Sequence, residues 1–376
     1  MNEVRVTASA SVTGLGPTLD ATWRRLLAGE TAVRPILRFD TSRYPARNAS
    51  WIGGLESVGS RSLLYPLLER LLDGFGPLPP GCRLVTATTK GCIDILERSR
   101  KGLPGDVADI PVSGPLKWLA TKLGVRDPAV NINCACASST MAVSRAAAMI
   151  GSGSADAVLV VCMDLVSEFV FSGFSSLLAL DPAGCRPFDR ERNGLSLGEG
   201  GAALLMMSAE TARRSGIHGI GSVAGWGAAN DATHITAPAR DGCGLTQAVR
   251  QAMAKASIGP DDIGAINAHG TGTVYNDMME VKAFETVFGS RSIPLNSIKG
   301  AIGHTLGAAG GIEVAVGLRS LADRTLPPTA GFREHMEKCV FSVSHRPQRI
   351  GGRYLLSTNS GFGGINAALI LKRIPE

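Results

Sequence analysis

Short apolar stretches alternate along the chain with longer segments in which apolar residues recur every three or four positions. The first pattern predicts buried strands and the second predicts the helices that cover them, so their alternation predicts an α/β fold. Residues 157–163 form an unbroken apolar run of seven residues between Asp156 and Asp164, which is typical of a buried strand and far too short to span a membrane. We expect strands over 83–88, 130–133, 157–162, 202–208, 263–268, 293–296 and 353–357, and helices over 18–28, 62–72, 115–123, 139–151, 245–256, 277–288 and 311–321.

One succession of elements occurs twice in the sequence. Residues 130–151 give a strand, a turn of small residues and an alanine-rich helix, and residues 294–321 give the same order. This repeat predicts two related halves, residues 1–200 and residues 201–376.

Cys136 lies where the apolar stretch 130–133 stops at small residues and a helical pattern begins. This arrangement puts the thiol on a sharp turn at a helix N-terminus, where unpaired amides and the helix dipole favour the thiolate. His269 and His304 lie in glycine-rich segments of the second half. Each of the three residues alone is compatible with an ordinary core position. Together, one cysteine and two histidines in tight turns indicate covalent catalysis.

The composition is that of a globular protein, with 44% hydrophobic and 19% charged residues. The formal charge of +6 fits either simple solubility or a basic face that meets an acidic partner. Nucleic acid is not expected as a partner, because the basic residues are spread without a dense stripe. The eight cysteines contain no CxxC pair, so we expect no metal site and no disulfide framework. Reduced cysteines and an N-terminus without a secretory signal predict a cytoplasmic protein with no membrane span.

Five segments resemble, in order, the motifs of the β-ketoacyl-acyl-carrier-protein synthases, in the Cys-His-His branch of the thiolase-fold condensing enzymes. The segments are 135–139 around Cys136, 185–200 with CRPFD and GEG, 269–277 with HGTGT, 299–313 with KGAIGH, and 359–366 with NSGFGG. The resemblance covers nearly the whole chain. It implies a thiolase-like fold, in which two duplicated halves give a layered αβαβα architecture.

The resemblance also implies a role for each motif residue. Cys136 is the implied acyl acceptor, and His269 and His304 are the implied donors to the enolate that decarboxylation produces. Lys299 is counted with this catalytic group, as a buried ammonium that needs a carboxylate partner, for which the family suggests Glu313.

Other motif residues are implied to surround the catalytic group. The implied supporting, oxyanion and gate residues are Glu313, Asp277, Phe362 and Gly363. The implied contacts of the pantetheine arm are Thr236, Thr271 and Thr273. The amides of Cys136 and Phe362 are the implied oxyanion hole. One departure concerns the gate, because the family has another aromatic before Gly361, where this chain has Ser360.

The activity that the resemblance implies is that of a 3-oxoacyl-[acyl-carrier-protein] synthase. This acyltransferase extends a cysteine-bound acyl chain by two carbons, through decarboxylative condensation with malonyl-carrier protein, in fatty-acid, polyene or polyketide-type biosynthesis. No bound cofactor and no metal are implied, because the acyl carrier protein supplies the phosphopantetheine. The implied assembly is a homodimer, or else a heterodimer with a second ketosynthase-like subunit.

Two other functions fit parts of the sequence. One is a chain-length-factor-like or obligate heterodimer subunit, although such partners typically lack the nucleophile that Cys136 provides. The other is a thiolase or a type III ketosynthase, which uses a different set of residues in its second half.

Overall fold

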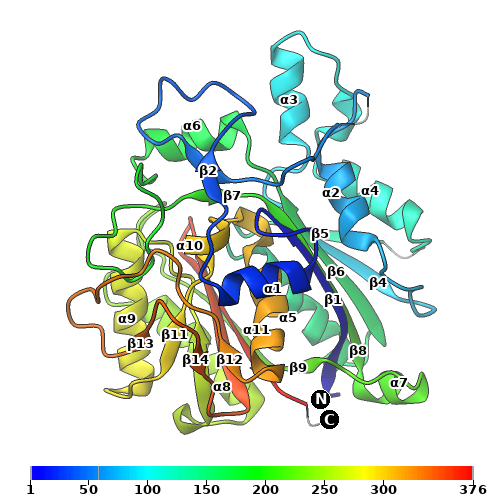
Figure 1. Ribbon diagram of the computed structural model, residues 1–376. Coiled ribbons are helices and arrows are strands. Elements are labelled where there is room, and N and C mark those ends of the chain that lie inside the picture. The colour runs from blue at the N-terminus through cyan, green and yellow to red at the C-terminus, as the bar shows by residue number, and fades with distance from the viewer. Residues whose placement is uncertain (1, 58, 127, 375–376) are drawn as a thin grey trace.

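The computed structural model describes residues 2–57, 59–126 and 128–374. Within these residues, eleven strands form one mixed sheet (Figure 1). From one edge to the other, its strands are β13 (Ser342–Val343), β11 (Pro294–Asn296), β10 (Ile263–Asn267), β15 (Tyr354–Gly361), β16 (Ile365–Lys372), β9 (Gly221–Asn230), β1 (Val4–Thr13), β8 (Gly200–Ser208), β6 (Ala157–Asp164), β4 (Arg83–Ala87) and β5 (Val130–Ile132). A small three-stranded sheet contains β2 (Val33–Pro35), β3 (Asn48–Ser50) and β7 (Leu197–Gly198). A two-stranded sheet contains β12 (Thr325–Leu326) and β14 (Gln348–Arg349).

The large sheet contains the same strand order twice. Outward from its middle, one run is β1, β8, β6, β4 and β5, and the other is β9, β16, β15, β10 and β11. In both runs the successive pairings are antiparallel, antiparallel, parallel and parallel. β1 pairs with β9 and joins the runs into one sheet. The division between residues 200 and 201 stays a prediction; the strand repeat passes from one run to the other between β8 and β9.

Eleven α-helices are present in the described part of the chain. They are α1 (Leu19–Leu27), α2 (Leu64–Leu72), α3 (Ile93–Arg100), α4 (Ser113–Lys122), α5 (Ser138–Gly151), α6 (Glu168–Ser176), α7 (Ala209–Arg214), α8 (Cys243–Ala256), α9 (Val274–Phe288), α10 (Lys299–Ile302) and α11 (Ala309–Ala322). Short 3₁₀ turns occupy Val107–Asp109, Pro260–Asp262 and Leu306–Ala308. None of the helices in this part of the chain is long and apolar enough to cross a membrane.

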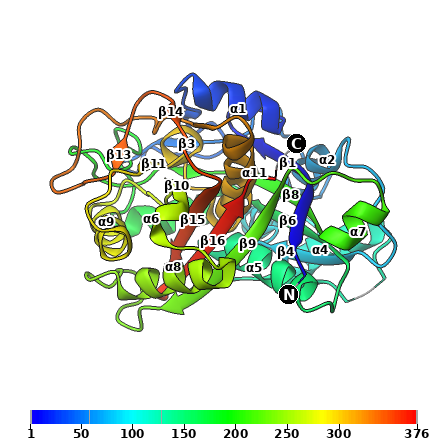
Figure 2. The same cartoon turned by 90° about the horizontal axis from the view of Figure 1, so that it is seen from below.

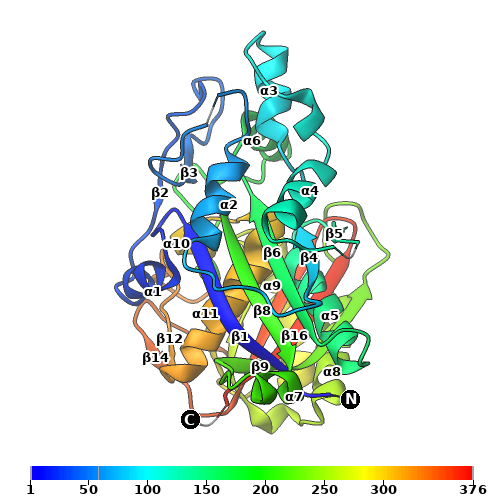
Figure 3. The same ribbon diagram turned by 90° about the vertical axis from the view of Figure 1, so that its right-hand side faces the viewer.

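The helices form three layers around the two runs of strands. α5 and α11 pack against each other and touch strands of both runs, so they form the central layer. α2 covers the outer face of the first run, whose strands lie side by side in Figure 3, and α8 covers the outer face of the second. Figure 2 shows α8 and α9 on one side of the molecule and α2 and α4 on the other. This arrangement confirms the predicted α/β class and its αβαβα layers.

All fourteen predicted strands and helices are present, with ends that differ by a few residues. The sequence pattern missed β1, β9 and β16, which lie at the centre of the sheet. The segment of β9 contains Gly225 and Gly227, which do not favour a strand. The structure explains these glycines, because a Cβ at either position would collide with backbone carbonyls of α8. The sequence of β9 is therefore determined by its close packing against α8, which hides the usual strand pattern.

Candidate active site

A sharp turn connects β5 to α5 and carries Cys136. Ala135 adopts a left-handed conformation with φ of 48°, and the N–H of Cys134 donates to Ser138 Oγ at 2.9 Å. Gly361 of β15 lies against this turn, where an added Cβ would come within 3.1 Å of Cys136 N. The turn is thus closed by small residues from both runs, and it holds the Cys136 thiol in a buried position just before the helix.

The Cys136 thiol is protonated at neutral pH. Burial raises its pKa to about 11, although Lys299, Lys90 and the backbone N–H of Phe362 oppose this shift. The helix N-terminus was expected to favour the thiolate, and in this structure burial outweighs that effect. A thiol in this state can act as a nucleophile only after its proton is removed.

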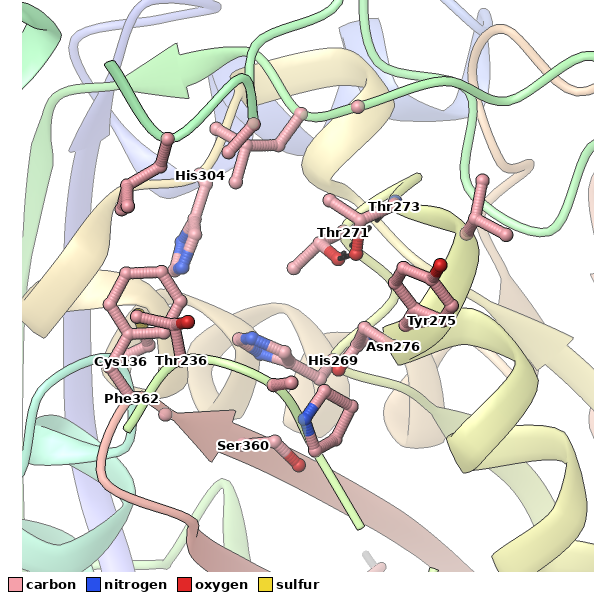
Figure 4. A pocket seen from close by; sticks show the side chains of 18 of the residues that line it. Cys136, Thr236, His269, Thr271, Thr273, Tyr275, Asn276, His304, Ser360 and Phe362 are labelled. Atoms are coloured by element: carbon pink, nitrogen blue, oxygen red, sulfur yellow. Dashed lines mark hydrogen bonds between the residues drawn. The ribbon is translucent and has the colours of Figure 1, made fainter. Parts of the chain in front are cut away.

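His269 and His304 come from the second run and meet Cys136 at the inner end of one cavity (Figure 4). His269 follows β10, and His304 follows α10 at Gly303, whose φ is 67°. The Cys136 Sγ and one ring nitrogen of each histidine all lie within 4.8 Å of one another. The histidine rings meet edge to face, with centroids 5.2 Å apart. Three residues far apart in the sequence therefore form one cluster.

Both histidines are neutral. Burial lowers the pKa of each ring well below its usual value, and the nearby charge of Lys299 lowers it further. Leu306 N donates to His304 Nδ1 at 3.3 Å, so the His304 proton lies on Nε2. Within the part of the chain that the structure describes, this Nε2 is buried without a hydrogen-bond partner. His304 therefore offers a free N–H donor beside the thiol.

A thiol and two neutral imidazoles are also a donor set that zinc accepts. The expectation of a site without metal or bound cofactor stays a prediction, and so do the roles that the sequence assigns to individual residues.

Lys299 and Glu313 form the expected pair. Lys299 Nζ lies 2.5 Å from Glu313 Oε1, and both side chains are only 1% exposed. The other carboxylate oxygen of Glu313 accepts from Asn359 Nδ2 at 2.8 Å. This amide also lies 3.2 Å from His269 Nδ1. Asn359 belongs to the 359–366 motif, but no sequence pattern singles it out within that motif.

Two acidic residues of α9 hold the His269 turn. Asp277 accepts from Phe188 N at 2.8 Å and from Gly272 N at 3.2 Å, so it supports the turn through backbone amides. Glu280 accepts from His269 N at 2.7 Å and from Gly270 N at 2.6 Å. Burial raises the pKa of Glu280 to about 8. Sequence reasoning missed Glu280, although its position three residues after Asp277 puts both on one face of the helix.

Phe362 lies at the loop between β15 and β16. Its ring stacks on Phe174 of α6, with centroids 5.7 Å apart. Gly363 N donates to Ile235 O at 2.6 Å, and Asn230 Nδ2 donates to Gly363 O at 2.9 Å. The loop is therefore tied to the 230–238 segment, while its aromatic ring contacts the first half.

The cavity has a volume of about 430 Å³. Thr236, Thr271 and Thr273 line it together with the cluster of Cys136, His269 and His304, as Figure 4 shows. The hydroxyls of Thr271 and Thr273 are 2.8 Å apart. The remaining lining is largely apolar, including Leu177, Leu178 and other residues of both halves. Such a cavity suits a flexible ligand with a few polar groups that reaches the thiol from outside.

Comparisons with known proteins agree with this geometry. Residues 117–212 match the family model described as Beta-ketoacyl synthase, N-terminal domain, and residues 220–333 match Beta-ketoacyl synthase, C-terminal domain. The chain is 35% identical to 3-oxoacyl-[acyl-carrier-protein] synthase 2 of Staphylococcus aureus (strain COL), over 98% of both chains. It is 33% identical to the tetracenomycin polyketide synthase ketoacyl synthase alpha subunit of Streptomyces glaucescens, over 95% of this chain and 93% of the other. A solved structure of the ishigamide ketosynthase/chain length factor superposes with a TM-score of 0.89 at 29% identity, over the full length of both chains.

Proposed function

Since the chain belongs to the β-ketoacyl synthase family, we propose that it is a 3-oxoacyl-[acyl-carrier-protein] synthase that uses Cys136 as its nucleophile. The observation that carries the proposal is the cluster of one thiol and two neutral imidazoles at the inner end of an open cavity. Acyl carrier proteins would deliver both substrates as thioesters on phosphopantetheine arms, so the protein itself needs no bound cofactor. The proposed reaction takes place in fatty-acid, polyene or polyketide-type biosynthesis.

The first step is acyl transfer to the cysteine. Cys136 Sγ attacks the thioester carbonyl, the carrier C–S bond breaks, and the thiol proton ends on the departing carrier sulfur. The backbone N–H of Phe362 contacts the Cys136 thiol, which supports a role for the Phe362 and Cys136 amides as donors to the tetrahedral oxyanion. Because burial keeps the thiol protonated, proton removal must accompany attack.

The second step is decarboxylation of malonyl-carrier protein. Cleavage of the carbon–carbon bond releases carbon dioxide and puts negative charge on the thioester oxygen. Nε2–H donors of His269 and His304 would stabilise this enolate, and a buried site strengthens such contacts. The enolate carbon then attacks the acyl group on Cys136, and the C–S bond breaks to give 3-oxoacyl-carrier protein. One proton from solvent restores the thiol.

The same proposal includes a dimer. β5 ends the large sheet with an open edge, and Val130 on this strand is 50% exposed. Open edge strands with apolar side chains favour pairing with another chain. The partner is a second copy or a ketosynthase-like subunit. The similar ishigamide structure names two components, a ketosynthase and a chain length factor. A cytosolic location is proposed as well, and the eight free cysteines support it.

Acyl loading tests the proposed nucleophile. Wild-type protein, Cys136→Ala and Cys134→Ala are each incubated with a series of acyl-carrier proteins, and their intact masses are measured. We expect one added acyl group on the wild type and on Cys134→Ala, and none on Cys136→Ala. A loaded Cys136→Ala protein would overturn the assignment. Loading that requires an added ketosynthase-like subunit would favour the obligate heterodimer over the homodimer.

A further inference from the structure

The side chain of Asn359 connects three elements behind His269. Its Nδ2 lies 2.8 Å from Glu313 Oε2 of α11 and 3.2 Å from His269 Nδ1. Its Oδ1 accepts the hydroxyl of Thr140 from α5. The residue is fully buried, and Gly310 leaves room for these contacts, because a Cβ there would collide with Thr140 Oγ1 and approach Asn359 Oδ1.

Glu313 determines which way the Asn359 amide points. Its carboxylate pairs with the Lys299 ammonium, and an ionised carboxylate only accepts hydrogen bonds. A reversed amide would put Asn359 Oδ1 against this carboxylate, with no proton between two acceptors. The amide nitrogen therefore faces Glu313, and its second hydrogen is directed at His269 Nδ1.

The position of the His269 proton follows from this orientation. An amide nitrogen donates and does not accept, so His269 Nδ1 must be the acceptor. A neutral imidazole carries a single ring proton, and burial keeps this ring neutral by holding its pKa well below the usual value. The proton therefore lies on Nε2, the other nitrogen of a ring that lines the catalytic cavity (Figure 4).

We propose that Asn359 is the positioning residue that sets the tautomer of His269, and that the Lys299–Glu313 pair acts on this histidine through the Asn359 amide. The catalytic meaning of the tautomer rests on the proposed function, whereas the tautomer itself does not. His304 reaches the same state through the backbone N–H of Leu306, which every substitution except proline keeps. His269 depends on a side chain, so its tautomer can be changed by one substitution.

Nitrogen NMR of protein labelled with ¹⁵N-histidine tests the proposal directly, because protonated and unprotonated ring nitrogens have well-separated shifts. The chain has six histidines, and His269→Gln identifies the signal of interest. We expect wild-type His269 to carry its proton on Nε2. Asn359→Leu, which has a similar volume and no donor, should lose this preference. Thr140→Val removes the contact on the other side of the same amide and should keep it.

Kinetics then connect the tautomer to the reaction. Asn359→Leu should lower kcat for malonyl-carrier decarboxylation by about 10²–10³-fold, the loss seen when one oxyanion donor is removed, with little change in KM. A wild-type His269 protonated on Nδ1 overturns the proposal even where Asn359→Leu does not fold. An Asn359→Leu protein that keeps the Nε2–H signal also overturns it. A wild type with the expected tautomer but no condensation would overturn the proposed function and leave the tautomer assignment intact.

Discussion

The two runs of strands share one topology, but they use their turns in different ways. β6 of the first run corresponds to β15 of the second, and β4 corresponds to β10. In the second run Asn359 of β15 bonds to His269, which follows β10. In the first run Asp164 of β6 bonds to residues that follow β4, accepting the hydroxyls of Thr88 at 2.7 Å and Thr89 at 2.8 Å.

The two regions differ in which buried polar atoms lack a hydrogen-bond partner. Asp164 also accepts from Gly307 N at 2.7 Å, so both of its buried oxygens have donors. The cluster in the second run instead contains His304 Nε2, which is buried and has no hydrogen-bond partner among the described residues. A satisfied buried group stabilises the fold, whereas an unpaired donor in a cavity is available to a substrate. The shared topology places the turns, and the side chains decide which of them carries chemistry.

The largest expected effect comes from breaking the ion pair of the second run. Lys299→Met leaves the Glu313 carboxylate buried without its cation, which costs about 3–5 kcal/mol of unfolding free energy. Urea unfolding measures this loss. The double variant Lys299→Met with Glu313→Met removes both charges and should recover most of the stability without recovering activity. A Lys299→Met variant as stable as the wild type would contradict the stabilising role of the Lys299–Glu313 ion pair.

The next effect concerns the unpaired donor. His304→Gln should reduce malonyl-carrier decarboxylation by about 10²–10³-fold, because the enolate loses one preorganised donor. Acyl loading should persist, since the Cys136 and Phe362 amides are unchanged. His218→Gln, at an exposed position, is the matched control and should keep the wild-type rate. Normal decarboxylation by His304→Gln would remove this histidine from the mechanism.

The corresponding change in the first run should affect stability and spare the chemistry. Asp164→Asn replaces an acceptor that has donors on both oxygens, and an unmatched buried polar group costs about 1–3 kcal/mol. Thermal or urea unfolding should show this loss, while turnover of the folded variant stays close to that of the wild type. A large loss of turnover at unchanged stability would mean that the first-run contact takes part in catalysis.

The smallest effect is a shift in thiol reactivity. With a pKa of about 11, Cys136 should react with iodoacetamide about tenfold faster for each pH unit between 7 and 10, because only the thiolate reacts. Subtracting the rate of Cys136→Ala isolates this thiol from the other cysteines. Lys299→Met should slow the reaction at a given pH, since Lys299 lowers this pKa. A plateau below pH 9 would contradict the raised pKa.

Much of the architecture could be predicted from the sequence, because buried strands and amphipathic helices have different periodicities. The run 157–163 identified β6, and the alanine-rich segment after Cys136 identified α5. β9 could not be identified in this way, since Gly225 and Gly227 are dictated by contact with α8. That requirement comes from tertiary packing and has no local signal.

The candidate site could be predicted only in part. Cys136, His269 and His304 stood out because reactive residue types lie among glycines and small residues, and the structure brings them together. Asn359 and Glu280 did not stand out, because their importance comes from their partners. Asn359 bonds to Glu313, which is distant in the sequence, and Glu280 bonds to the preceding turn at His269. The protonation of the Cys136 thiol was also beyond the sequence, since it depends on how deeply the turn is buried.

Condensation by the pre-acylated protein tests the central claim most directly. Wild-type protein loaded with one acyl group is separated from its donor and mixed with malonyl-carrier protein, and the mass of the carrier is followed. We predict that malonyl-carrier protein is converted to 3-oxoacyl-carrier protein, two carbons longer than the loaded chain, while the acyl group leaves Cys136. An acyl group that stays on the enzyme, or a carrier that only loses carbon dioxide in the presence of every tested partner subunit, would contradict the account.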